Sequence, residues 1–314
     1  MQLSIMERFG IIEVSARVIL GKYPKLKQIA KRIRAQKSRG GDQSDATPID
    51  PILKVQYFQK LDAFIKQDDI VLIHSSMDGL KTIGITAEEF IDYMKKQVDK
   101  KGVTFVLPCF PTTNLTPPTE KSRPYDPKKT ICWTGMLPNK FLCEEGVIRT
   151  KFPYNSLAAM GPKAEEMMAH DMEATSVYDK TSAWRYCYDN HAKLLFAGVK
   201  ASSSNTMGSH MVPDLMGEEW PVKDWYQDVT YKVRIDGEVS EKVVRVQKDM
   251  WAQYCMEERT SGYLKEADVL TEEYIGDCNL GMVEDCKKMM DVLIDLSKKG
   301  KLVYMIPRRY LKRR

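Results

Sequence analysis

Apolar and polar positions along the chain follow two different periods, and their alternation predicts helices and strands in turn. Apolar residues recur at helical spacing over residues 53–65, and the continuous apolar run Ile70–Ile73, typical of a buried strand, follows. Thr86 and Glu89 then have the spacing of a helix capping box, and the apolar run Val103–Leu107 comes after that helix. A strand, a helix and a second strand in this order predict two parallel strands joined by a crossover.

The second half of the chain combines one more core strand with a hairpin. The segment Lys193–Val199 is almost wholly apolar and predicts a third buried strand. Residues Tyr231–Ile235 and Val239–Val246 alternate instead between apolar and polar side chains, and Asp236-Gly237 lies between them. An Asp-Gly pair between two alternating segments is a strong signal for an antiparallel hairpin.

The last predicted elements are an amphipathic helix over residues 284–296 and a closing strand over residues 302–306. The whole pattern predicts an α/β fold with a mixed, largely parallel central sheet flanked by helices and an antiparallel hairpin insertion. We divide the chain into a basic N-terminal extension and linker, residues 1–50, and one large domain, residues 51–314.

Composition narrows the class of protein. Hydrophobic residues make up 43% of the chain and charged residues 29%, as in ordinary globular proteins, and no apolar run is long enough for a membrane span. Glu7 and Arg8 interrupt the N-terminal apolar stretch, which argues against a secretory signal, so we expect a cytoplasmic protein. The seven cysteines form no C-x-x-C pair and no zinc-ligand pattern with the four histidines, so we expect reduced thiols and no metal.

Positive charge is concentrated near the N-terminus. Residues 22–39 contain eight basic side chains, and Ile29 and Ile33 within them have helical spacing. A polar, glycine-containing connector over residues 38–48 follows. Such a segment is either a solvated arm or a peripheral contact with an acidic membrane surface, and without interleaved aromatic residues it does not indicate nucleic-acid binding.

His210 is the main candidate for chemistry. It lies in a polar segment, residues 202–221, that follows the third core strand and is expected to be a loop, and Asp214 comes four residues later. Histidine is the side chain whose usual pKa lies nearest neutrality, so one presented beyond a strand end is a candidate proton carrier. The alternative is a loop histidine without a role. No G-x-G-x-x-G, P-loop or G-x-S-x-G motif supports a nucleotide-binding or serine-hydrolase function instead.

An ordered set of short motifs carries a family resemblance. These are His74-Ser75-Ser76-Met77, Leu107-Pro108-Cys109-Phe110, Tyr125-Asp126-Pro127, Thr134-Gly135-Met136-Leu137-Pro138, Gly146-Val147-Ile148-Arg149-Thr150, Pro153, Ser156 to Gly161, Ser182, Leu194 to Gly198, and Asn205-Thr206 with His210. Together they resemble the aminoglycoside N3-acetyltransferase family over residues 50–300. The resemblance implies acetyl transfer from acetyl-CoA to an amino group of an amino sugar or aminoglycoside.

The resemblance also implies roles for particular residues. His210 corresponds to the general base, and Asp214 would take the place of the family's usual glutamate, since Pro213 stands where that acid is expected. The Thr206 hydroxyl and the backbone N–H groups near Ser75 and Ser76 are candidate donors to the oxyanion. Another departure is Phe152, where the family commonly has a histidine.

The remaining candidates hold the cofactor and the acceptor. For CoA they are His74, Ser75 and Ser76 on the pantetheine arm, Arg149 on a phosphate, and Ser156. For a cationic acceptor they are Asp126, Glu218 and Glu219. Turn chemistry, a surface ion pair and ordinary loop positions are the alternatives for these residues.

Three functions remain open from the sequence. The first is N-acetylation of an aminoglycoside antibiotic, and the second is N-acetylation of an amino sugar in surface-polysaccharide or nucleotide-sugar metabolism. The basic N-terminal arm favours the second, because a resistance enzyme has no evident need for a membrane-seeking extension. The third is a relative without catalytic activity that binds a sugar or a partner, which the loss of the acid at Pro213 would allow.

Overall fold

The computed structural model describes residues 3–23, 49–203 and 207–312. The predictions for residues 22–48 concern mainly residues 24–48, which lie outside the described residues. Thr206 lies outside them as well. The described strands are β1 (Ile70–Ser75), β2 (Thr104–Pro108), β3 (Ile148–Arg149), β4 (Leu157–Met160), β5 (Lys193–Ala197), β6 (Tyr226–Ile235), β7 (Glu238–Gln247), β8 (Thr271–Ile275) and β9 (Cys278–Val283). The described α-helices are α1 (Ile5–Arg8), α2 (Gly10–Lys22), α4 (Pro51–Phe64), α5 (Met77–Lys81), α6 (Ala87–Lys101), α7 (Met136–Phe141), α8 (Ala164–Met168), α9 (Ala183–Asp189), α10 (Met207–Met216), α11 (Glu257–Glu266) and α12 (Cys286–Lys298).

Seven strands form one mixed sheet in the order β3-β4-β2-β1-β5-β9-β8. The central strands β2, β1 and β5 run parallel, and the strands added at both edges pair antiparallel. The parallel pairing predicted for the first two strands is confirmed, with Ile70 opposite Thr104. The fold class predicted from the sequence is therefore confirmed, with parallel strands at the centre of a mixed sheet.

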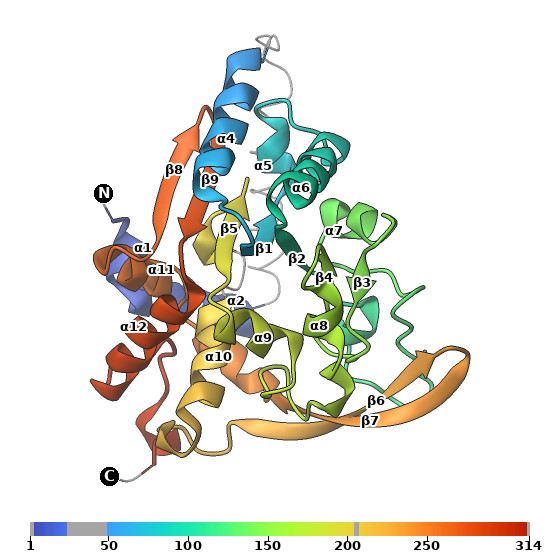
Figure 1. The fold of residues 1–314 in the computed structure, drawn as a ribbon. Helices are drawn as coiled ribbons and strands as arrows, with labels where there is room; N and C mark the ends of the chain where they lie inside the picture. Colours follow the sequence, from blue (N-terminus) through green and yellow to red (C-terminus); the bar gives the residue numbers. More distant parts are fainter. Residues whose placement is uncertain (1–2, 24–48, 204–206, 313–314) are drawn as a thin grey trace.

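Helices cover both faces of this sheet (Figure 1). Adjacent strand residues point to opposite faces, so Ile73 packs with the side chains of α4, α5, α6 and α7, whereas Leu72 packs with those of α8, α9, α10 and α12. The predicted capping box opens α6: the Thr86 hydroxyl accepts from the backbone N–H of Glu89 at 3.2 Å, and the Glu89 carboxylate accepts from that of Thr86 at 2.9 Å. Gly102 ends α6 in the left-handed conformation, with φ of 63°.

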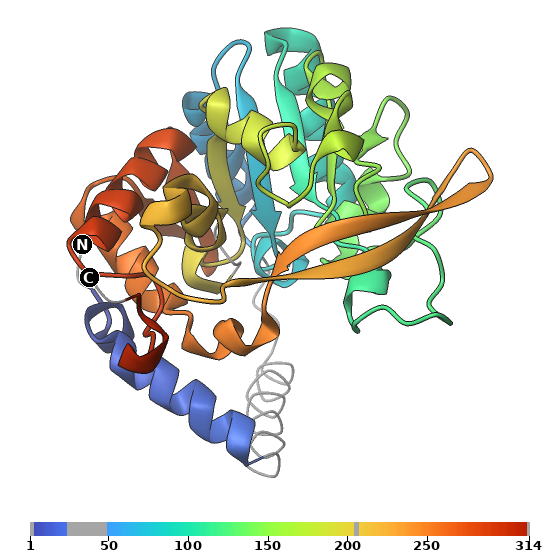
Figure 2. The same ribbon diagram turned by 90° about the horizontal axis from the view of Figure 1, so that it is seen from below.

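The predicted hairpin is confirmed as β6 and β7, which pair over their full length and extend away from the sheet (Figure 2). Asp236 and Gly237 form its turn with φ of 49° and 96°, as a two-residue hairpin turn requires. The outer half of the hairpin is tied to Tyr125, whose backbone N–H donates to Lys232 at 2.8 Å and whose carbonyl accepts from Arg234 at 2.7 Å. These two hydrogen bonds hold the hairpin against the segment that contains Tyr125.

The sequence predictions were wrong for two segments, and they missed four of the described strands. Residues 302–306 do not form a strand. Among them only Tyr304 forms a β-bridge, with Cys255, because α11 begins almost directly after Cys255. The polar segment 202–221 is largely helical, and His210 lies within α10 rather than in a loop. β3, β4, β8 and β9 were not predicted, although β4 pairs with the core strand β2 and β9 pairs with the core strand β5.

None of the described helices is both long and apolar enough to cross a membrane. The seven cysteines are all present as free thiols, and six of them are buried.

Candidate functional site

A cavity opens beyond the carboxyl end of β2, between α10 and the base of the β6–β7 hairpin. Ligands bind in α/β folds at this end of the strands, because the loops there diverge. Many of the lining side chains are aromatic, and they are those of Phe110, Trp133, Tyr154, Tyr178, Trp184, Trp225 and Tyr226. Among the residues that the structure describes, the charged ones at its lining are Asp214, Asp249, Arg245 and Lys248, two of each sign.

His210 enters this cavity from α10 and is held through its Nδ1 atom. The Tyr304 hydroxyl lies 2.7 Å from Nδ1, the Gln247 side-chain oxygen lies 3.2 Å from it, and the same hydroxyl donates to that oxygen at 3.3 Å. Gln247 offers a carbonyl oxygen, which only accepts, so all three contacts are hydrogen bonds when Nδ1 carries the proton. The ring then has its lone pair on Nε2.

Burial also favours the neutral form of this ring. It lowers the pKa of His210 below its usual value, and the hydrogen bond to Gln247 opposes that effect. A neutral imidazole with its lone pair on Nε2 is able to accept a proton at neutral pH.

Asp214 lies one helical turn after His210 and lines the same cavity. Its carboxylate accepts from the Tyr226 hydroxyl at 2.9 Å and from the Ser176 hydroxyl at 3.2 Å, which are its hydrogen bonds within the described part of the chain. Burial raises the pKa of Asp214 to about 6, although both hydroxyls act in the other direction. The expectation that Asp214 orients the histidine is replaced: Tyr304 and Gln247 hold the ring, and Asp214 faces the cavity separately.

His74, Ser75 and Ser76 lie at the end of β1 and are not among the residues found to line this cavity. The His74 ring stacks on Phe196 with centroids 5.3 Å apart, and burial lowers the pKa of His74 to about 4. Its Nε2 has no hydrogen-bond partner among the described residues. The backbone N–H of Ser76 donates to the Ala197 carbonyl at 2.9 Å, so this group is not available to an oxyanion.

Arg149 and Ser156 act inside the protein. The Arg149 guanidinium donates to the carbonyls of Thr130 and Cys109, the latter at 2.5 Å, and to the Ser156 hydroxyl at 3.2 Å. Ser156 in turn donates to the Cys109 carbonyl at 2.5 Å. Both residues therefore anchor the loop that carries the cavity residue Phe110, and these hydrogen bonds of theirs are made to groups of the protein itself.

The three acidic candidates for the acceptor lie away from this cavity, judged by its lining among the described residues. Asp126 caps a turn by accepting from the backbone N–H of Lys128 at 2.9 Å. Glu219 forms an exposed ion pair with Lys298 at 3.1 Å, and Glu218 next to it is exposed as well. The structure thus brings together His210 and Asp214 but not these three residues.

Sequence reasoning missed the residues that hold His210 and Asp214 by hydrogen bonds, which are Tyr304, Gln247, Tyr226 and Ser176, and it also missed the charged lining residues Arg245, Lys248 and Asp249. Tyr304 belonged to a segment whose apolar pattern suggested only a strand, and it lies 94 residues from His210 along the chain. The one available signal was Gln247, a polar residue at the end of an alternating strand.

Comparisons with known proteins give a consistent family and fold. The sequence model of the family described as aminoglycoside 3-N-acetyltransferase matches residues 72–297. Among solved structures, the apoenzyme of aminoglycoside acetyltransferase AAC(3)-IVa is similar, with a TM-score of 0.63, 16% identity, and coverage of 82% of this chain and 92% of that one. The AAC-IIIb binary complex with CoASH has a TM-score of 0.63 and 16% identity, with coverage of 79% of this chain and 96% of that one. The sisomicin-bound AAC-VIa has a TM-score of 0.60 and 17% identity, with coverage of 79% of this chain and 98% of that one. At these identities the structural likeness shows the fold.

Proposed function

We propose, from the premise that this chain belongs to the aminoglycoside 3-N-acetyltransferase family, that it acetylates an amino group of an amino sugar in the cavity beside His210. Family membership makes the chain an acetyltransferase. The similar AAC-IIIb binds CoA, which supports acetyl-CoA as the donor. The observation that carries the proposal is a histidine held at Nδ1, with a carboxylate one turn away, in an aromatic cavity.

The proposed reaction is a direct transfer in a ternary complex. The acceptor nitrogen attacks the thioester carbonyl carbon, the new carbon–nitrogen bond forms, and the carbon–sulfur bond breaks to release CoA. The proton lost by the nitrogen passes to Nε2 of His210 and from there to the departing thiolate. A positioned base of this kind contributes about 10²–10⁴ in rate.

Tyr304 and Gln247 have a positioning role in this proposal. Together they fix the ring orientation and keep the proton on Nδ1, so that Nε2 is the basic atom. When the ring is charged during the reaction, both oxygens still face Nδ1–H as acceptors. A neutral pair thereby replaces the carboxylate that is usual in a triad.

Thr206 remains the proposed donor to the oxyanion, since it comes four residues before His210 in the sequence. For the cofactor, we keep His74 and Ser75 as candidates, because the unpartnered Nε2 of His74 is a buried polar atom that lacks a bond within the described residues. Arg149 and Ser156 are not included, since their donors are used by backbone carbonyls and each other.

The charges of the cavity favour one class of acceptor. Asp214 and Asp249 are balanced by Arg245 and Lys248, so the lining has no excess of negative charge. A polycation requires a strongly acidic site, whereas a sugar with one amine needs one carboxylate and aromatic rings for its apolar face. The balance therefore supports an amino sugar of low charge over a polycationic aminoglycoside.

A thiol-release assay with acetyl-CoA tests the proposal. The panel contains monoamino sugars such as glucosamine and, beside them, the polycations gentamicin and sisomicin. We expect acceptor-dependent release with the first group and a fall in kcat of about 10²–10⁴ for His210→Ala. His170→Ala, at an exposed histidine, is the matched control and should keep full turnover.

Two outcomes would contradict the proposal in different ways. Full turnover by His210→Ala would remove the base from the mechanism. Absence of thiol release with every amine would support the alternative of a sugar- or partner-binding relative without catalysis.

A further inference from the structure

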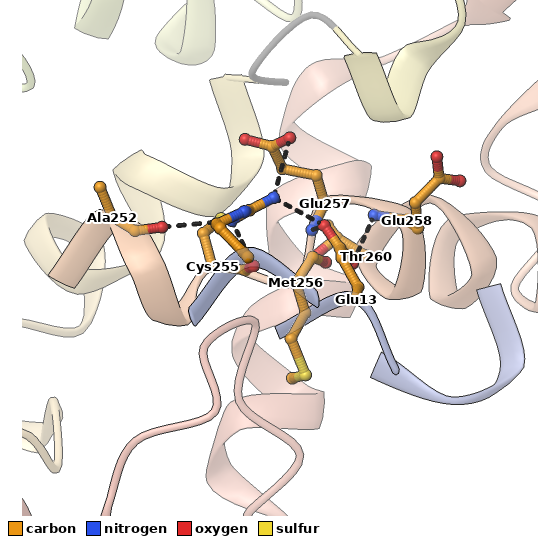
Figure 3. A network of polar contacts seen from close by, with 8 residues as sticks. Glu13, Ala252, Cys255, Met256, Glu257, Glu258 and Thr260 are labelled. Carbon is orange, nitrogen blue, oxygen red and sulfur yellow. Dashed lines mark hydrogen bonds and ion pairs between the residues drawn. The ribbon is translucent and has the colours of Figure 1, made fainter. Parts of the chain in front are cut away.

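Helix α2 is attached to the domain by its charged side. Glu13 is buried, and its carboxylate accepts from the backbone N–H groups of Glu257 at 2.9 Å and Glu258 at 3.1 Å (Figure 3). These are the first N–H groups of α11, which have no partner inside that helix. Glu13 therefore supplies a cap from a distant part of the chain.

Arg17 completes the attachment, one turn further along α2. Its guanidinium donates to the carbonyls of Ala252 at 3.1 Å and Cys255 at 2.7 Å, and it pairs with Glu13 at 2.9 Å. Val14 is buried on the same side. The helix thus presents both of its described charged side chains to the protein.

The opposite side of α2 is largely apolar and exposed. Ile11, Ile12 and Ile19 are 59%, 41% and 49% exposed, and the small side chain of Ser15, which lies between them, is exposed too. At 3.6 residues per turn these four positions lie within an arc of about 100°. We call the three isoleucines the outer face of α2.

This arrangement is the reverse of an ordinary surface helix. Such a helix turns its apolar stripe to the core and its charges to water. On α2 the isoleucines are exposed instead, and so are Ile5 and Phe9, directly before the helix. A contiguous exposed apolar patch on a globular protein marks a surface that contacts something else. The polar attachment of the inner side keeps the outer face directed outward.

The sequence that follows α2 indicates what the outer face contacts. Residues 22–39 contain eight basic side chains and no acidic one. An exposed apolar helix face, with strong positive charge following directly in the sequence, is the combination that binds the surface of an anionic bilayer. Two copies of the chain carry this positive charge alike, and their repulsion opposes a contact between two outer faces.

We propose that the outer face of α2 docks on an anionic lipid surface, which attracts the net positive charge that the sequence carries directly after α2. The isoleucine side chains enter the boundary between headgroups and acyl chains, while α2 lies parallel to the membrane plane. This inference is independent of the acceptor proposed above.

Sedimentation of the full chain with lipid vesicles tests the inference. The vesicles contain phosphatidylcholine with phosphatidylglycerol in one series and phosphatidylcholine alone in the other. We expect binding to the first series that weakens as salt is raised, since salt screens the basic segment. The triple variant I11Q/I12Q/I19Q should bind about a hundredfold more weakly, because three half-buried apolar contacts are lost.

The matched control changes exposed apolar residues elsewhere. Val239 and Val243 on the hairpin are 51% and 56% exposed, and V239Q/V243Q should bind vesicles like the unchanged chain. Thermal unfolding of both variants checks that they fold. The proposal is overturned if the unchanged chain does not bind anionic vesicles or if the triple variant binds them as tightly as the unchanged chain. It is equally overturned if light scattering finds a dimer that the triple variant abolishes without any vesicle binding, since the outer face would then contact a second copy.

Discussion

Replacing Asp214 with asparagine should raise stability at neutral pH and lower affinity for the acceptor. The carboxyl has a pKa of about 6 in the folded protein against an ordinary 3.8, because burial disfavours its charged form. Between these pH values the folded state holds the proton more tightly than the unfolded state. The free energy of unfolding therefore falls as pH rises through this window, by a total of about 3 kcal/mol at 1.36 kcal/mol per pKa unit.

Asparagine keeps the shape of the side chain but has no charge to desolvate. The asparagine oxygen accepts a hydrogen bond from one of the two hydroxyls, those of Tyr226 and Ser176. The other hydroxyl must turn so that it accepts from the asparagine NH₂ group, which costs about 1–2 kcal/mol. The net change for Asp214→Asn is then a gain of about 1–2 kcal/mol above pH 7 and a loss of similar size below pH 4. In a chain of this size the gain is a rise in Tm of a few degrees.

The kinetic readout separates the two roles considered for Asp214. An anchor for the acceptor predicts a KM raised about tenfold with kcat little changed, because a charge-assisted hydrogen bond is lost. A role in orienting His210 predicts instead a lower kcat and a displaced pH profile. Melting curves and steady-state kinetics across pH 4–8 measure both quantities. Ser176→Ala is the control, since it removes a hydrogen bond to the carboxylate but leaves the charge in place.

A variant that is less stable than the unchanged chain at every pH would refute the reasoning about burial. An unchanged KM for the acceptor would refute the anchor.

Two further predictions concern the histidine and the packing of α5 against the end of β5. Tyr304→Phe removes the hydroxyl that stabilises the imidazolium at Nδ1 of His210, so kcat should fall about tenfold and the acidic limb of the pH–rate profile should move to lower pH. The control Tyr310→Phe should leave both quantities unchanged. A drop in kcat without any displacement of the profile would contradict the positioning role. Gly79→Ala should lower the free energy of unfolding by about 2–4 kcal/mol, measured by urea titration, because a Cβ at that position would lie 2.0 Å from the carbonyl oxygen of Gly198. An unchanged urea midpoint would show instead that α5 can shift away from β5.

Local signals predicted the framework of the fold well. The apolar runs of β1 and β2, the Thr86 capping box and the Asp236-Gly237 turn all act over a few residues, so the sequence alone contains their cause. The segment 302–306 has the same apolar pattern as a strand, but its partner leads straight into α11 and leaves room for a single bridge. Its apolar residues are explained by burial rather than by a ladder.

The site was predicted only where its residues are close in sequence. His210 and Asp214 were both identified, and the structure places them in one cavity. The groups that hold the histidine, Tyr304 and Gln247, come from segments 94 and 37 residues away. Nothing in a local pattern encodes such a contact, since only the packing of α10 against the hairpin base and the C-terminal segment creates it.

The placement of His210 and Asp214 on a single helix also bears on which nitrogen of an acceptor is modified. At a rise of about 1.5 Å per residue, the separation of four residues sets the two side chains about 6 Å apart along the axis of α10, and no movement of a loop changes that spacing. In the proposed reaction an acceptor would be bound by one group at Asp214 and react at the nitrogen that this spacing places beside His210. Regioselectivity would then be a property of helix geometry, while the surrounding loops could vary to admit acceptors of different size.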